Sequence, residues 1–161
     1  MNRLVAALVI CATTAAAAAQ VAEDVVRYPS TYASFKQVRT ITVKQDPPHG
    51  TVFLNAEAAS AERASYPYGS VVVMEWRKDG PAGAIARLDV MRKEKGFGAS
   101  YGPDRTGEWE YASYSPDGKL VTNAAQARAC AQCHAKAGAA KDFVYVGKFA
   151  APAAEKGIRR H

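Results

Sequence analysis

The sequence lacks, in its interior, any apolar stretch of the roughly 20 residues that a membrane-spanning helix requires. Its one long apolar run covers residues 4–19, at the N-terminus behind the positively charged Arg3. The run ends in three alanines, residues 17–19, which are the small residues of a signal-peptide cleavage site. We therefore expect residues 1–19 to be a secretory signal peptide and residues 20–161 to form a single exported, periplasmic domain. An uncleaved N-terminal anchor is the alternative.

Charge of one sign is not in large excess, and it is not gathered in one block. The chain has 21 Lys and Arg against 15 Asp and Glu, and loss of Arg3 with the leader leaves a formal charge of +5. An exported domain rarely meets nucleic acid. The balance therefore favours a solvated surface or docking of an acidic redox partner over nucleic-acid binding.

Short alternating stretches rich in β-branched residues fill the middle of the chain. They predict strands over residues 38–44, 51–54, 70–77, 84–92, 108–114 and 142–149. Helical patterns predict a short helix at 31–36 with Ser30 as its N-cap, another at 55–64 capped by Asn55, and a longer one at 123–135. Asn123 and Gln126 have the spacing of a capping box at the start of that last helix. The sum is an α+β domain, mainly an antiparallel β-sheet with flanking helices and a C-terminal helix.

Cysteine is scarce, and its placement carries the chemistry. Once Cys11 is removed with the leader, only Cys130 and Cys133 remain, and they are followed at once by His134. This C-x-x-C-H motif is the attachment signature of c-type haem. Two thiols one helical turn apart add across the haem vinyl groups, and the adjacent histidine ligates the iron. The motif predicts one covalently attached haem c, with His134 as an axial iron ligand.

Three other uses of this motif fit less well. A thioredoxin-like redox pair follows a strand in a βαβ unit, whereas this pair lies inside an alanine-rich helix. A structural zinc site needs four ligands, and only His49 and His161 remain as nitrogen donors. A plain disulfide leaves His134 without a role.

Methionine is also scarce, and none follows the haem motif. Before Cys130 stand 129 residues, only 27 follow His134, and the last methionine is Met91. Small electron-transfer cytochromes carry the motif early and a methionine ligand well after it. A late motif without a downstream methionine is typical of five-coordinate, gas-binding cytochromes, in which nothing strong binds opposite the histidine.

Several segments, in this order, resemble the cytochrome P-460 family and its relatives, the cytochromes c′-beta. The resemblance spans residues 28–149, and the matching segments are 69–75 (GSVVVME), 86–89 (ARLD), 107–111 (GEWEY), 130–134 and 142–145. It implies an exported, mostly antiparallel β domain with one haem c near the C-terminus. It also implies a homodimer and a haem that handles nitrogen oxides.

The sequence departs from that pattern at one position. Hydroxylamine-oxidising members have a lysine in Gly-x-Val-x-Val-Lys-Glu that is covalently joined to the porphyrin edge, and this chain has Met74 there. Met74 packs on the haem edge, ligates the iron, forms another bond to the haem, or is a core residue beside Val72 and Trp76. The family's distal, proton-relaying carboxylate corresponds to Asp89, which is either the catalytic acid or base or a solvated strand residue. Arg87 is expected to be a surface charge or a partner of Asp89 or of a haem propionate.

Two classes of function follow from these expectations. The first is a mono-haem cytochrome with an open distal iron site that binds nitric oxide, oxidises hydroxylamine, or does both. Asp89 would move protons there, and a partner cytochrome would collect electrons; a gas sensor or scavenger without turnover is a variant of this class. The second is an electron-transfer cytochrome with Met74 as the sixth ligand.

Overall fold

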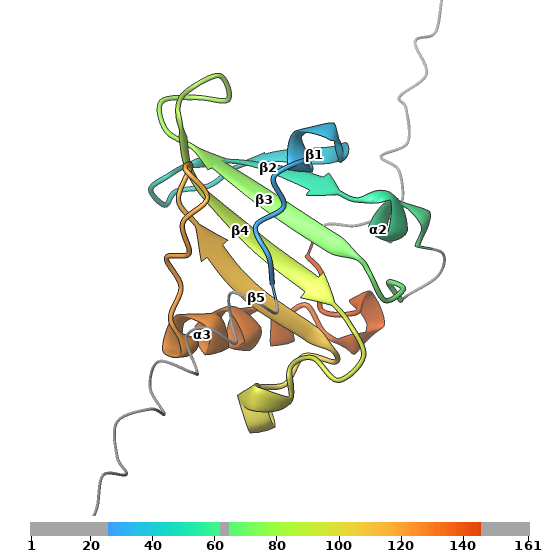
Figure 1. The fold of residues 1–161 in the computed structure, drawn as a ribbon. Helices are drawn as coiled ribbons and strands as arrows, with labels where there is room; N and C mark the ends of the chain where they lie inside the picture. The colour runs from blue at the N-terminus through green and yellow to red at the C-terminus, as the bar shows by residue number, and fades with distance from the viewer. Residues whose placement is uncertain (1–25, 62–64, 146–161) are drawn as a thin grey trace, which may run out of the picture.

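The computed structural model describes residues 26–61 and 65–145, so the expected signal peptide lies outside it. The described chain forms one antiparallel sheet of five strands in sequence order (Figure 1). The strands are β1 (Lys36–Thr42), β2 (His49–Leu54), β3 (Val71–Arg77), β4 (Ile85–Lys93) and β5 (Trp109–Tyr114). This arrangement confirms the predicted α+β class and five of the six predicted strands. No helix within residues 26–61 and 65–145 has the length and apolar character needed to cross a bilayer.

The helical segments are short, apart from one. They are η1 (Tyr32–Ser34), α2 (Ala56–Ser60), η2 (Ala99–Asp104), α3 (Ala124–Ala135) and η3 (Ala139–Lys141). Asn55 caps α2 as predicted, because its side-chain oxygen accepts a hydrogen bond from the backbone N–H of Ala58. The prediction of Ser30 as a cap is wrong: η1 begins after Thr31, whose side chain makes no capping bond.

Helix α3 begins at the predicted capping box. The side chain of Asn123 accepts a hydrogen bond from the backbone N–H of Gln126 at 3.0 Å, and the Gln126 side chain accepts from the backbone N–H of Asn123 at 2.9 Å. Two N–H groups that the first helical turn leaves unpaired are satisfied in this way. The capping box therefore fixes where α3 begins, and with it the helical turn that carries the C-x-x-C-H motif.

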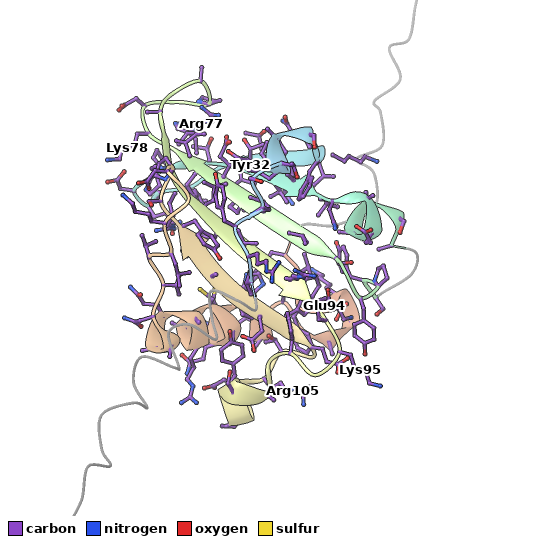
Figure 2. All side chains as sticks on the ribbon, in the orientation of Figure 1. Tyr32, Arg77, Lys78, Glu94, Lys95 and Arg105 are labelled. Atoms are coloured by element: carbon purple, nitrogen blue, oxygen red, sulfur yellow. The ribbon has the colours of Figure 1, made fainter. Side chains whose placement is uncertain are left out.

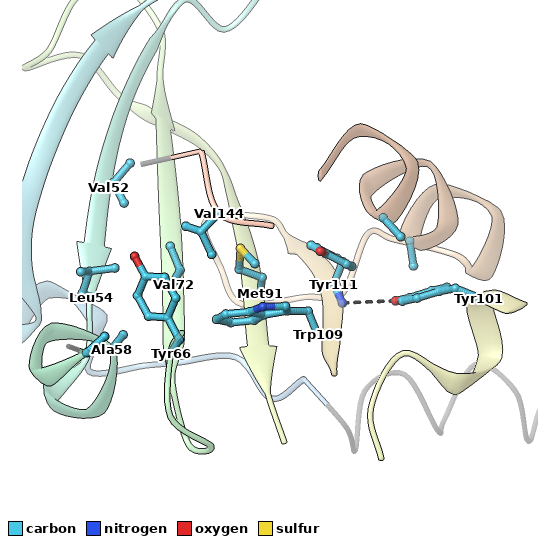
Figure 3. Packing of buried hydrophobic residues seen from close by; sticks show 13 residues of the cluster. Val52, Leu54, Ala58, Tyr66, Val72, Met91, Tyr101, Trp109, Tyr111 and Val144 are labelled. Carbon is cyan, nitrogen blue, oxygen red and sulfur yellow. Dashed lines mark hydrogen bonds between the residues drawn. The ribbon is translucent and has the colours of Figure 1, made fainter. Parts of the chain in front are cut away.

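The sheet has a hydrophobic cluster on each face, and different parts of the chain cover the two faces (Figure 1). The N-terminal segment covers one face with Val26 and with Tyr32, which is labelled in Figure 2. Tyr32 donates a hydrogen bond to the buried Glu75 at 2.6 Å. On the other face α3 packs against β5 and η2. Figure 3 shows the cluster on this second face, whose larger members are Leu54, Tyr66, Val72, Met91, Tyr101, Trp109, Tyr111 and Val144.

The strand predicted over residues 142–149 is wrong in its described part. Asp142 and Phe143 have positive backbone φ angles of 49° and 61°, which an extended strand does not allow. Residues 142–145 instead form the end of a turn that follows η3, and residues 146–149 lie outside the described chain. The alternating sequence favours a strand, but tertiary contacts of Asp142 override that preference.

Candidate haem-binding site

Helix α3 presents the C-x-x-C-H motif along one edge of the sheet. Ala127 and Ala131, one turn apart, are buried against the core, which brings Cys130 and His134 into half-buried positions beside it. Cys133 faces outward and is exposed, and both cysteines are free thiols. The helix is tied to η2 by a hydrogen bond of 3.1 Å from the Gln132 amide to the Asp104 carboxylate.

His134 is oriented by a backbone carbonyl. Its Nδ1 lies 2.7 Å from the carbonyl oxygen of Phe143. A carbonyl only accepts, so Nδ1 carries the proton and Nε2 keeps a free lone pair, the arrangement that a metal-ligating histidine needs. The imidazole lies between the rings of Tyr111 and Tyr145, with centroid distances of 5.0 and 5.4 Å. Burial lowers the pKa of His134, which favours the neutral imidazole that binds iron.

The two thiols have different surroundings. Burial and the negative charge of Asp89 raise the pKa of Cys130 to about 11. Cys130 packs against the core cluster on the face of the sheet that also carries Met74. Cys133 lies beside Tyr145, whose hydroxyl donates to the Cys133 carbonyl oxygen at 2.7 Å and lies 3.9 Å from its sulfur. One thiol therefore lies at the sheet and the other at the surface of the same helical turn.

Asp89 is held by donors from three strands. It accepts hydrogen bonds from the Trp76 indole N–H at 2.7 Å and the Ser113 hydroxyl at 2.6 Å. Arg87 donates to the same carboxylate at 3.0 Å and lies over the Trp76 ring, 6.0 Å from its centroid. Asp89 is thus a fixed, half-buried anion, and of the expectations for Arg87 the pairing with Asp89 is the one observed.

Met74 lies beside Asp89. The two residues are directly opposite each other in the register of β3 and β4, and so their side chains share one face of the sheet. Met74 is half-buried and packs against the core cluster, on the same side as Val72 and Trp76. Gly50 on β2 leaves room for it: a Cβ atom at Gly50 would stand 2.8 Å from the Met74 sulfur.

Two features of this site were not predicted from the sequence. One is the carbonyl of Phe143 as the partner of His134, and the other is Lys93, whose ammonium lies 2.6 Å from the carboxylate of Asp142. No local pattern marks either contact. The acceptor for His134 is a backbone carbonyl, which has no residue signature. Lys93 and Asp142 are 49 residues apart in the chain. His49, by contrast, lies on β2 and contacts Thr42 at 3.3 Å, away from the motif.

A protein-family model described as Cytochrome P460 matches residues 29–146, which is most of the chain. The chain belongs to the cytochrome P460 family. This cytochrome P460-family protein is therefore a haem-binding cytochrome, with haem iron as its cofactor. A search of curated proteins gave no significant match.

The residues present at the site fit a haem. The chain supplies a neutral imidazole with a free Nε2 and two free thiols one helical turn apart. The half-buried side chains of Met74 and Asp89 face the side of the sheet on which Cys130 lies. Among residues 26–61 and 65–145, no group of three or more His, Cys, Asp or Glu side chains gathers to hold a metal ion on protein ligands alone.

Proposed function

We propose that this chain is an exported mono-haem c-type cytochrome with an open distal iron site that binds nitric oxide and oxidises hydroxylamine. Cys130 and Cys133 would hold the haem covalently, and His134 would ligate its iron. The observation that supports catalysis is the fixing of Asp89 by Trp76 and Ser113 near the Cys130 thiol. A fixed carboxylate near a bound haem could accept the proton that a nitrogen ligand loses on oxidation.

A haem held by Cys130, Cys133 and His134 would supply an iron that can coordinate the nitrogen of hydroxylamine or nitric oxide and accept electrons. The protein's residues orient the reactants and move protons. A carboxylate oxygen of Asp89 accepts the proton that hydroxylamine loses as electrons leave it, while the Arg87 guanidinium and the Trp76 N–H keep the carboxylate in place. Each electron that hydroxylamine loses would pass to a partner cytochrome, and an accompanying proton would pass through Asp89 to solvent.

A second function is favoured by the position of Met74. Its half-buried thioether faces the same side of the sheet as Asp89, and among the described residues Met91, the other methionine, is buried within the core cluster. If the Met74 sulfur reaches the iron, the sixth position is filled and the protein is an electron carrier. An open site without turnover would make it a nitric-oxide-binding protein instead.

The proposed location and partners come from the sequence. The charged and apolar leader supports export to the periplasm, where c-type haem is attached. The excess of Lys and Arg supports docking of an acidic redox partner. The family resemblance supports a homodimer.

Hydroxylamine-dependent reduction of an added electron acceptor tests the proposed reaction. We expect Asp89→Asn holoprotein to lose at least about 10²-fold in kcat while binding nitric oxide as tightly as the wild type, because only turnover needs proton transfer. Asp117→Asn is the matched control, since Asp117 is an exposed carboxylate paired with Lys119. Equal turnover in wild type and Asp89→Asn would remove Asp89 from the mechanism.

A further inference from the structure

The turn that follows α3 brings a carbonyl back to the helix it has just left. After Gly138, with φ of 80°, the chain passes through η3, and the N–H of Phe143 bonds to the Gly138 carbonyl at 3.0 Å. Asp142 adopts the left-handed conformation and Phe143 has a positive φ of 61°, and a positive φ is unfavourable for residues with a Cβ atom and most of all for a bulky one. Such a conformation persists only where the surroundings impose it.

The contacts that impose this backbone conformation are made by Asp142. Its carboxylate accepts a hydrogen bond from Lys93 Nζ at 2.6 Å and from the backbone N–H of Tyr66 at 2.8 Å. Its backbone carbonyl accepts from the Trp109 indole N–H at 2.9 Å. The side chains of Lys93 and Asp142 are each only 10% exposed, so water does not screen their attraction. We call these two residues the proximal ion pair.

Val144 anchors the same turn from the other side. It is buried in the core cluster near Tyr66, Val72 and Met91 (Figure 3). Phe143, whose carbonyl oxygen contacts His134, therefore lies between Asp142, which the ion pair holds, and Val144, which apolar packing holds. Contacts of Asp142 with β4 and β5 and the burial of Val144 therefore hold that carbonyl in place, in addition to the covalent connection to α3.

We propose that the proximal ion pair is a positioning device that fixes the Phe143 carbonyl on Nδ1 of His134 and thereby sets the electron-donating strength of the axial ligand. The proposal rests on the proposed role of His134 as the iron ligand. A histidine whose Nδ1–H donates to a firmly held acceptor is a more basic ligand and stabilises the ferric haem. Loss of the ion pair loosens this hydrogen bond, which weakens the bond from histidine to iron and raises the reduction potential.

The test compares holoprotein variants by resonance Raman spectroscopy and redox titration. We expect Lys93→Met to lower the ferrous iron–histidine stretching frequency and to raise the ferrous-to-ferric ratio at fixed potential about 10-fold, which is about 59 mV for one electron. Lys93→Arg keeps the charge and is expected to restore both values. Arg92→Met is the matched control, because it breaks the neighbouring Arg92–Glu94 ion pair, of 2.7 Å and partly exposed, without touching Asp142.

Lys93→Met leaves the Asp142 charge buried without its partner, so where it does not accumulate as folded holoprotein, the double variant Lys93→Met/Asp142→Asn decides, because it removes both charges and the amide keeps an acceptor and the volume. Frequencies and potentials equal to those of Arg92→Met in both variants would overturn the proximal ion pair's role. Absence of an iron–histidine mode in reduced wild type would contradict the proposed open site instead, and the potential alone would then decide the role of the ion pair.

Discussion

Met74 and Asp89 stand directly opposite each other on β3 and β4 and share the face of the sheet that α3 flanks. The resemblance drawn from the sequence implies that the cross-linking lysine of hydroxylamine-oxidising members corresponds to Met74. Directly opposed residues have Cβ atoms about 4.5–5.5 Å apart, so an ammonium at this position would compete with Arg87 for the carboxylate. The thioether leaves Asp89 to the donors that hold it, Trp76, Arg87 and Ser113.

The packing role of Met74 predicts how its variants behave. Met74→Leu keeps most of the side-chain volume, so we expect the ferric spectrum to stay unchanged and the free energy of unfolding to fall by less than about 1.5 kcal/mol. Met74→Ala leaves a cavity and should cost about 2–5 kcal/mol. Absorption spectroscopy and urea unfolding measure both. Conversion of a low-spin wild-type spectrum to a high-spin one in Met74→Leu would show that the sulfur is the sixth ligand.

The approach of Gly50 to Met74 predicts a packing conflict in Gly50→Ala. The added Cβ would stand 2.8 Å from the Met74 sulfur and 3.0 Å from the Trp76 ring. We expect the free energy of unfolding to fall by about 1–3 kcal/mol, as overpacking does in a tight core. In the double variant Gly50→Ala/Met74→Ala the two losses should be less than additive, because the methyl group fills part of the vacated volume. Strict additivity would mean that the two side chains do not meet.

The elements with local signals could be predicted from the sequence. Alternation marked the strands, and the side chain of Asn123 marked the first turn of α3, because capping depends only on residues three apart. The turn at Asp142 could not be predicted, since its conformation depends on contacts with Lys93 and Trp109, far away in the chain. The same holds for the site: the motif gave the thiols and the histidine, but the carbonyl that orients His134 is a backbone group without a residue signature.

The thiol of Cys130 is expected to react slowly in haem-free protein made without the leader. Burial and the charge of Asp89 raise its pKa from the ordinary 9.0 to about 11, which lowers its thiolate fraction near pH 8 about 100-fold. The exposed Cys133 should therefore be alkylated by iodoacetamide first. In mass-spectrometric time courses, the alkylation rate of Cys133 is the internal reference for the alkylation rate of Cys130. Asp89→Asn should speed alkylation of Cys130, because the pKa falls when the negative charge is removed.

Equal alkylation rates for Cys130 in wild type and Asp89→Asn would show that the thiol does not face the carboxylate. The pH dependence gives an independent check. The Cys130 rate should keep rising about tenfold for each pH unit until the pH approaches 11.

The proposed function depends on a haem c, held by Cys130 and Cys133, whose iron has an open position opposite His134. Absorption spectra of the purified holoprotein, oxidised and reduced, before and after addition of nitric oxide, test for this open position. We predict high-spin bands that shift when nitric oxide is added. Low-spin bands that do not respond to nitric oxide would overturn the open position and make the protein an electron carrier with a filled sixth position.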